Sequence, residues 1–317
     1  MVQRNALGHD MAYRPRADAP VIIANTMTDL SYDGIEVGKQ YGPWKYPLKE
    51  RIARHLEATE NQHPWHHERS PWGPPVAPPS LLGQAAMIFI GEIAPLPPGT
   101  LHAKQQIETA AALRLDRQPI LYGRFLDKYE RRGRRWTVFE ARCRDETGLL
   151  IGHSQLTLAF PERVETADEP TAKKQPANGG QQKGELTPVV RNLTQERMTA
   201  YSEDSANALR GKSIHTSAEI AAAAGFPATV AQGLMSVDHI SELIESELGQ
   251  EWYAHANLSV TFLRPALCGD TLTTNGRLSE SREEGGVLRK VYNVWSENQR
   301  GETVTSGTAS SLTMRQG

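Results

Sequence analysis

The chain has 317 residues, of which 38% are hydrophobic and 23% charged, and its formal net charge is -2. This is a globular composition, and the length suffices for one large or two ordinary domains. The near-neutral charge argues against nucleic-acid binding, and no run approaches the roughly 18 apolar residues of a membrane span. Residues 1–16 also lack the apolar core of a signal peptide. We therefore expect a cytoplasmic protein with neither a nucleic-acid nor a membrane partner.

The two cysteines, Cys143 and Cys268, lie in separate strand-like segments rather than in a paired motif. They form neither a disulfide framework nor a metal-ligand pattern. We expect both to be buried as small hydrophobic side chains.

The first half of the chain is predicted to form a short strand, two helices and a sheet. Residues 1–34 show no strong periodicity and are predicted to be an N-terminal arm. From Ile35 a short strand leads into a helix that ends near Asn61. Residues 62–80 are so rich in proline that we expect no regular structure there. Residues 81–93 then form an apolar helix.

Three strand-forming segments follow this helix. They cover residues 101–110, 120–148 and 149–160. The middle segment contains a turn at residues 132–134 and alternates apolar with polar positions on both sides of it, so it is predicted to be a hairpin. Residues 161–186 are polar and rich in Pro, Gly and Gln, which is typical of a linker.

The second half contains the most informative stretch, residues 201–249. Apolar residues recur in it every three or four positions, at Val230, Leu234, Val237, Ile240, Ile244 and Leu248. This spacing predicts a helix buried along one face, with Glu242, Glu245 and Glu247 lying off the apolar stripe. Gly249 just beyond the last apolar position is suited to a C-terminal cap.

The beginning of this helix could bind a ligand oxygen. Gln232 and Gly233 stand where backbone N–H groups have no partner inside the helix, so an oxyanion could be held there. Upstream, Asp204, Asn207 and His215 could handle a proton. The simpler interpretation is that Gly233 only permits close packing and that His215 is a loop histidine bonded to the backbone.

The two halves repeat each other at a nearly constant offset. At 153 residues, His102 aligns with His255, Gly133 with Gly286 and Gly148 with Gly301. At 154 residues, the segment 76–79 (VAPP) aligns with 230–233 (VAQG). Each half is therefore predicted to be a loop, a long helix and an antiparallel sheet, an α+β fold with an N-terminal domain over residues 35–160 and a C-terminal domain over residues 187–317.

The segment VAQG at the helix start, followed by Phe262, Pro265, Gly269 and Asp270 in the pattern F-x-x-P-x-x-x-G-D, resembles the MaoC-like hotdog-fold hydratases and dehydratases. The resemblance covers nearly all of residues 35–317. This family includes the (R)-specific enoyl-CoA hydratases and the mesaconyl-CoA hydratases. It implies two tandem hotdog folds, each a long helix wrapped by an antiparallel sheet, which together form a pseudo-dimer.

The resemblance implies a catalytic loop in each half. In the second half His215 matches the family histidine, but Asn207 precedes it by eight residues instead of the usual five, which leaves Asp204 or Asn207 as its partner. Gln232 replaces the histidine that usually precedes Gly233.

In the first half, Asn61, His63 and His66 fit the pattern N-x-H-x-x-H without an insertion. However, Pro78 and Pro79 occupy the positions of Gln232 and Gly233, and proline has no N–H to offer an oxyanion. We favour His215, and we interpret Asn61 and His66 as a vestigial or second site.

The implied reaction is the reversible hydration of a trans-2-enoyl thioester of coenzyme A, as in fatty-acid metabolism. His215 would be the general base, Asp204 or Asn207 would orient the water, and the N–H of Gly233 would hold the thioester oxygen. Gln232 and Asp238 would lie beside the substrate. The reaction requires no metal and no cofactor beyond the coenzyme A of the substrate.

Two other functions share this fold. A hotdog thioesterase would attack the thioester carbonyl and usually needs a carboxylate on the central helix, for which Asp238 is the candidate. A non-catalytic acyl-CoA-binding module would explain the altered loop and Gln232. The sequence does not define the acyl group, and it leaves open whether two chains pair as a homodimer along their sheet edges.

Overall fold

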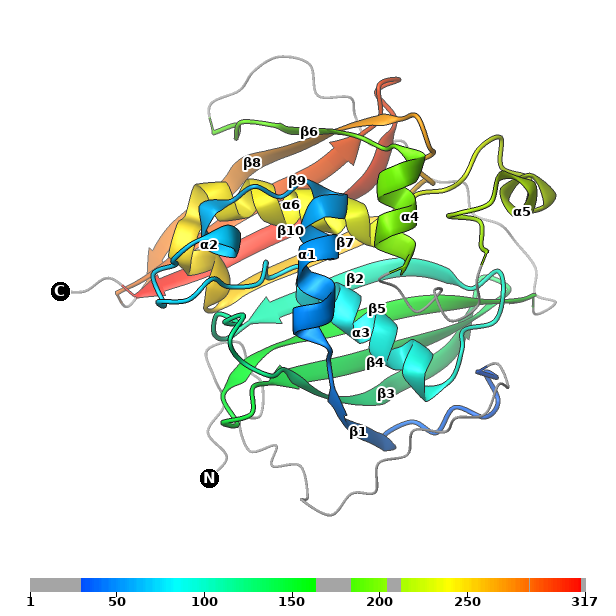
Figure 1. The fold of residues 1–317 in the computed structure, drawn as a ribbon, viewed down its shortest axis with the longest axis horizontal. Helices are drawn as coiled ribbons and strands as arrows, with labels where there is room; N and C mark the ends of the chain where they lie inside the picture. The colour runs from blue at the N-terminus through cyan, green and yellow to red at the C-terminus, as the bar shows by residue number, and fades with distance from the viewer. Residues whose placement is uncertain (1–29, 164–183, 204–211, 285, 315–317) are drawn as a thin grey trace.

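The computed structural model describes residues 30–163, 184–203, 212–284 and 286–314. Within them, ten strands form one antiparallel sheet in the order β1-β3-β4-β5-β2-β7-β10-β9-β8-β6. The helices lie together on one face of this sheet, with α3 across one half and α6 across the other (Figure 1). No helix of the described ranges combines the length and the apolar character that crossing a membrane requires.

The elements of the first half occur in the order strand, helices, four strands. Their bounds are β1 (Gln40–Lys45), α1 (Leu48–Thr59), α2 (Pro64–His67), α3 (Leu81–Ile93), β2 (Leu101–Thr109), β3 (Ile120–Arg131), β4 (Arg134–Arg144) and β5 (Leu150–Arg163). The second half repeats this order with β6 (Val189–Asn192), α4 (Gln195–Glu203), α5 (Ala218–Ala223), α6 (Gly233–Leu248), the 3-10 helix η2 (Gly249–Tyr253), β7 (Ala256–Phe262), β8 (Thr271–Glu284), β9 (Val287–Glu297) and β10 (Thr303–Met314).

The predicted internal repeat is visible in the sheet. The order β1-β3-β4-β5-β2 of the first half is mirrored by β7-β10-β9-β8-β6 of the second, and the halves meet where β2 pairs with β7. At this junction Ile107 is paired with Leu258 and Gln105 with Val260. Most of the predicted linker and nearly all of the predicted arm lie outside the described residues.

Most predicted elements of the first half are confirmed, with one error. The apolar helix has the predicted bounds, Leu81–Ile93, and the hairpin turns at Arg132 and Gly133, both with positive φ. The proline-rich stretch was expected to lack regular structure, but it contains the short helix α2. Pro64 is compatible with this helix because it stands in the first turn, where its missing N–H would have no helical partner, and the His63 side chain accepts from Trp65 N.

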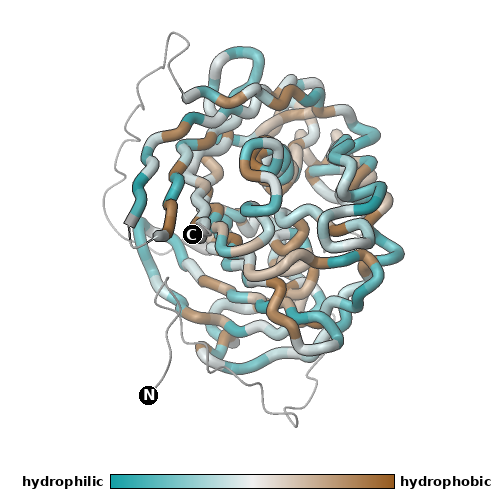
Figure 2. Tube along the Cα trace, turned by 90° about the vertical axis from the view of Figure 1, so that its left-hand side faces the viewer, coloured by the Kyte–Doolittle hydropathy of each residue, from teal (hydrophilic) through white to brown (hydrophobic). Residues whose placement is uncertain are grey.

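The core lies between the helices and the sheet. Residues along the strands alternate between hydrophobic and hydrophilic (Figure 2), as expected when one face of a sheet is covered. Cys143 is buried in this core, and burial raises the pKa of its thiol to about 12, whereas Cys268 is only half-buried. The expectation of burial is thus confirmed for Cys143 and only partly for Cys268.

The F-x-x-P-x-x-x-G-D pattern has a structural role around Asp270. Its carboxylate accepts from Leu267 N at 2.9 Å, from Gln299 Nε2 at 2.9 Å and from Arg300 Nη1 at 3.1 Å. Asp270 therefore fixes the turn that leads into β8.

Candidate functional site

His215 is clamped to the backbone just before α6. Its Nδ1 lies 2.7 Å from the carbonyl oxygen of Val230. A carbonyl can only accept, so Nδ1 carries the proton, and the neutral ring keeps its lone pair on Nε2. Burial lowers the pKa of His215 and outweighs the hydrogen bond to Val230, which favours the neutral ring at pH 7. The structure thus holds His215 in the protonation state that a general base requires.

The loop around His215 is fixed by further hydrogen bonds. The amide of Val230 donates to Ile214 O at 3.0 Å, and Gln195 Nε2 donates to His215 O at 3.0 Å. His215 N donates to Ser213 Oγ at 3.2 Å. The ring position is therefore set by several short contacts from α4, the loop itself and the strand-like segment before α6.

The first turn of α6 leaves two amides without an acceptor. Ala231 N donates to Ala266 O at 2.8 Å and Met235 N to Gln232 O at 3.0 Å. Among the described residues, no hydrogen bond is found for the amides of Gly233 and Leu234. These N–H groups lie at the positive end of the helix dipole, so they are suited to hold an oxyanion.

Gly233 is also required by packing. A Cβ placed on it would lie 2.9 Å from the ring of Phe262, which is closer than real Cβ contacts. Both readings of the sequence therefore apply to this position, because a glycine is needed for the close approach and its amide has no partner.

Gln232 and Asp238 are used in contacts between helices. Gln232 does not cap α6, and its Nε2 donates to Ser202 Oγ of α4 at 3.0 Å. Asp238 is 5% exposed, accepts from Tyr201 Oη at 2.6 Å and lies 3.4 Å from His55 Nε2. Burial raises the pKa of Asp238, but His55, Ser80 and Tyr201 together outweigh it and hold this pKa below its usual value.

Asp238 therefore joins α6 to α1, α3 and α4, and it is neither an exposed helix carboxylate nor free of strong partners. The other predicted partners of His215, Asp204 and Asn207, lie in residues 204–211, outside the described residues. The described chain ends at Glu203 and resumes at Lys212, three residues before His215.

The comparison with protein families matches the second half of the chain. The family described as "MaoC like domain" matches residues 186–297, which include His215, the start of α6 and Asp270. Residues 186–297 form a MaoC-like domain. The comparison with curated proteins gave no match.

Solved structures share the fold of the whole chain. A protein named MaoC-like dehydratase has a TM-score of 0.70 at 15% identity, over 89% of this chain and 99% of its own. A putative MaoC domain dehydratase from Chloroflexus aurantiacus has a TM-score of 0.67 at 11% identity, over 93% and 100%. A Mycobacterium tuberculosis protein described as a double hotdog fold has a TM-score of 0.60 at 13% identity, over 90% and 98%. The expected pair of tandem hotdog folds is thus confirmed.

The first half has the same histidine clamp as the MaoC-like domain. His66 Nδ1 lies 2.8 Å from Val76 O, and Val76 is the counterpart of Val230 in the repeat. The Asn61 side chain does not reach this ring in a hydrogen bond. Its Oδ1 accepts from His63 N at 3.0 Å, so it shapes the loop.

The start of α3 differs from the start of α6 in the MaoC-like domain. Leu81 N donates to Pro78 O, Leu82 N to Pro79 O and Gly83 N to Ser80 O, at 3.0, 3.3 and 2.8 Å. These three amides therefore have acceptors and the two prolines have no N–H, so among the described residues at this helix start only the amide of Ser80 is found without an acceptor. This observation supports the preference for the second half.

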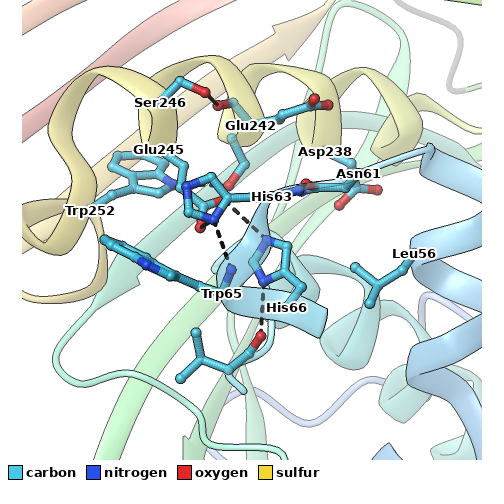
Figure 3. Close-up of polar contacts among 12 residues, drawn as sticks. Leu56, Asn61, His63, Trp65, His66, Asp238, Glu242, Glu245, Ser246 and Trp252 are labelled. Carbon is cyan, nitrogen blue, oxygen red and sulfur yellow. Dashed lines mark hydrogen bonds and ion pairs between the residues drawn. The ribbon is translucent and has the colours of Figure 1, made fainter. Parts of the chain in front are cut away.

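Sequence reasoning missed Glu245. It lies off the apolar stripe of α6, yet it is 1% exposed, because its carboxylate lies 3.2 Å from His66 Nε2 (Figure 3). It also accepts from the hydroxyl of Tyr253. The signal that could have found it is the spacing of Asp238, Glu242 and Glu245, which places three carboxylates along one side of α6.

A small apolar pocket lies in the first half, against Tyr253 of the second. Its wall includes Ala77, Pro78, Pro79, Leu82 and Tyr253. No residue of the His215 loop or of the start of α6 lines it. This pocket is therefore separate from the unpaired amides of the MaoC-like domain.

Proposed function

We propose that this chain is a hydro-lyase that reversibly hydrates a trans-2-enoyl thioester of coenzyme A to a 3-hydroxyacyl thioester, with its working site in the MaoC-like domain. The observation that carries the proposal is the position of His215, whose ring is bonded to the backbone three residues before the unpaired amide of Gly233. The proton acceptor is thus hydrogen-bonded to the segment 230–233, which also carries the oxyanion donor.

His215 would be the general base. Because Nδ1 donates to Val230 O, Nε2 has the lone pair that removes a proton from water. The water oxygen then bonds to C3 of the enoyl group, and the electron pair of the double bond moves onto the thioester oxygen. His215 returns the proton to C2, so the imidazole ends the cycle neutral.

Residues 204–207 would supply the partner that holds the water. Asp204 could both orient the water and accept a proton, whereas Asn207 could only orient it. Negative charge on the thioester oxygen would be stabilised by the amide of Gly233 or Leu234, and the loss of one such donor typically costs 10²–10³-fold in kcat. Gln232 and Asp238 would hold the start of α6 in position through their hydrogen bonds to α4.

The structural neighbours support the same reaction class. The proteins that share this fold at full length include ones named dehydratase, and 15% identity to the first of them establishes the fold rather than the activity. The proposed reaction needs no cofactor, because coenzyme A takes part only as a portion of the substrate.

The thioesterase alternative is disfavoured by Asp238. A helix carboxylate that attacks or activates water at the thioester carbonyl needs access to substrate, and Asp238 is buried and bonded to Tyr201 Oη at 2.6 Å. The acyl-CoA-binding alternative is addressed by the same assay as the hydratase.

The assay mixes the protein with crotonyl-CoA and follows the enoyl absorbance and free thiol together. We expect loss of absorbance without thiol, and the reverse reaction from 3-hydroxybutyryl-CoA. Release of thiol would identify a thioesterase. No change with crotonyl-CoA, nor with longer or branched enoyl-CoA substrates, combined with saturable binding of those thioesters, would identify a binding module and reject the proposal.

A further inference from the structure

Three ligand atoms from the two halves converge at one point beneath α6. They are His63 Nδ1 and His66 Nε2 from the loop and short helix of the first half, and a carboxylate oxygen of Glu245 from the second. All three lie within 4.8 Å of one another. Figure 3 shows both rings on the side of α6 from which Glu245 projects. None of them belongs to the His215 site.

The hydrogen bonds around the cluster fix which ring nitrogens face Glu245. His66 Nδ1 donates to Val76 O, so Nε2 is the nitrogen that faces Glu245 and would bind an ion. His63 Nδ1 accepts from Trp65 N at 3.3 Å, so this nitrogen carries a lone pair, 3.5 Å from Glu245 Oε1.

A cation could bind all three atoms, because they lie close to the spacing of ligands around a small ion. Zinc binds nitrogen and carboxylate oxygen at about 2.0–2.2 Å, so neighbouring ligands of a tetrahedral ion lie about 3.3–3.6 Å apart. His66 Nε2 lies 3.2 Å from Oε2 of Glu245 and His63 Nδ1 lies 3.5 Å from its Oε1, so small side-chain movements would bring both rings and one carboxylate oxygen to this spacing.

The hydrogen bonds that hold His66 and Glu245 resemble those around the ligands of a metal site. A ligating histidine usually donates its other N–H to a carbonyl or carboxylate, as His66 does to Val76 O. Glu245 is likewise held by the hydroxyl of Tyr253. His66 and Glu245 are almost fully buried, whereas the His63 side chain is 19% exposed, which leaves an approach for an ion and a fourth ligand.

From this geometry we propose that His63, His66 and Glu245 form a binding site for a divalent transition-metal ion of the zinc type, with one coordination position left for water. On binding, the weak contact from Trp65 N to His63 is exchanged for a coordination bond. The ion joins the loop of the first hotdog to the central helix of the second. It therefore stabilises the arrangement of the two halves, independently of hydration at His215.

The test is a titration of the full chain, freed of metal by a chelator and dialysis, with Zn²⁺ in a calorimeter and with Co²⁺ by visible absorption. We expect one equivalent of zinc per chain and the intense visible bands of tetrahedral cobalt. At a free zinc concentration 100 times Kd, the melting temperature should rise by about 5 °C.

Two variants remove ligands from different elements, with a matched control for each. Glu245→Gln and His63→Asn should each weaken zinc binding at least tenfold and abolish the cobalt bands. Glu247→Gln, two residues along α6 and exposed, and His67→Asn, next to the cluster and exposed, should bind zinc like the parent chain. Asn at position 63 keeps an acceptor for Trp65 N, because Asn is a preferred N-cap residue, so this variant preserves α2.

Absence of a stoichiometric site in the parent chain overturns the proposal whatever the variants do. Binding that survives in both ligand variants also overturns it, because the ion then lies elsewhere. No thioester is used in these measurements, so a negative result here leaves the hydratase proposal to its own assay.

Discussion

The two hotdog halves keep the same histidine clamp but differ at the beginning of the central helix. His66 and His215 both donate through Nδ1 to a valine carbonyl, at 2.8 and 2.7 Å. In the first half, two prolines precede α3 and three amides are bonded, which leaves only the amide of Ser80 without an acceptor at this helix start. In the second half, Gly233 leaves its amide unpaired. The halves therefore share the histidine contact and differ in the amides that lack an acceptor, which are those of Gly233 and Leu234 at the start of α6 and that of Ser80 at the start of α3.

The halves also differ in the carboxylate that reaches each loop. Glu245 of α6 meets His66, and its counterpart in α3, at the same distance from the valine, is Gly91. Glycine brings no carboxylate to the second loop. His215 therefore depends on its own loop for an acidic or amide partner, which agrees with the candidates Asp204 and Asn207.

The largest expected effect separates the two histidines. His215→Ala should reduce the kcat for hydration of crotonyl-CoA by 10²–10⁴-fold, because general-base catalysis contributes about this much. His66→Ala should leave most of the turnover, since Pro79 stands at the position of Gly233 in the first half and has no N–H to hold the oxyanion. Steady-state kinetics of both variants, with circular dichroism to verify folding, measures the difference.

Equal losses in both variants, with both folded, would mean that the halves act together. A loss confined to His66→Ala would move the site to the first half, next to Glu245 and the apolar pocket.

The second effect tests the helix start directly, by giving α6 the proline of α3. Gly233→Pro removes one N–H, and proline is tolerated at the first helical position. Gly233→Ala is the matched control, because its Cβ meets Phe262 in the same way but the N–H remains. We expect kcat of the proline variant to be about 10²–10³-fold below that of the alanine variant, as for the loss of one oxyanion donor. Equal kcat values would show that the amide of Gly233 does not hold the oxyanion. The amide of Leu234 would then be the remaining candidate in α6.

Much of the fold could be predicted from the sequence, because its signals are local or periodic. The helix over Leu81–Ile93 and the hairpin at Arg132 follow from apolar spacing and turn residues, and the repeat follows from a constant offset. The helix α2 was missed, because Pro64 was treated as a breaker although a first-turn proline is compatible with a helix.

The site was only partly predictable, because its contacts join distant parts of the chain. His215 and Gly233 carry family motifs and could be found. The buried roles of Asp238 and Glu245 could not, since each depends on partners in the other half, His55 and His66. An acidic residue on a helix is usually solvated, and only the packing of the two halves makes these two exceptions.

The third effect concerns the contact between the halves, where α6 has Asp238 and the equivalent position of α3 has Gln84. Asp238→Asn makes both positions neutral and removes the charge that faces His55, which is fully buried. We expect a loss of about 3 kcal/mol in the free energy of unfolding, because removing one partner of a buried pair leaves the other uncompensated. Urea unfolding at pH 7 measures it, with the exposed Glu57→Gln as a control expected to lie within about 0.5 kcal/mol of the parent chain. A loss as small as that of the control would show that the hydroxyl of Tyr201, rather than charge, holds this contact.

The smallest effect depends on pH and on a second difference between the helices, His239 of α6 against Ala85 of α3. Burial lowers the pKa of His239 to about 4, although Asp238 partly opposes it. An unfolded histidine titrates near 6.5, so the unfolded state binds the proton first, and stability decreases as the pH falls below about 6.5. At pH 5 the loss from this residue should be about 2 kcal/mol relative to pH 7.5. His239→Ala, which gives α6 the residue of α3, should therefore lose about 2 kcal/mol less than the parent chain between these pH values, whatever its cavity costs at pH 7.5. Urea unfolding at both pH values measures this, and parallel losses in the two proteins would mean that His239 is protonated as easily in the folded chain as in the unfolded one.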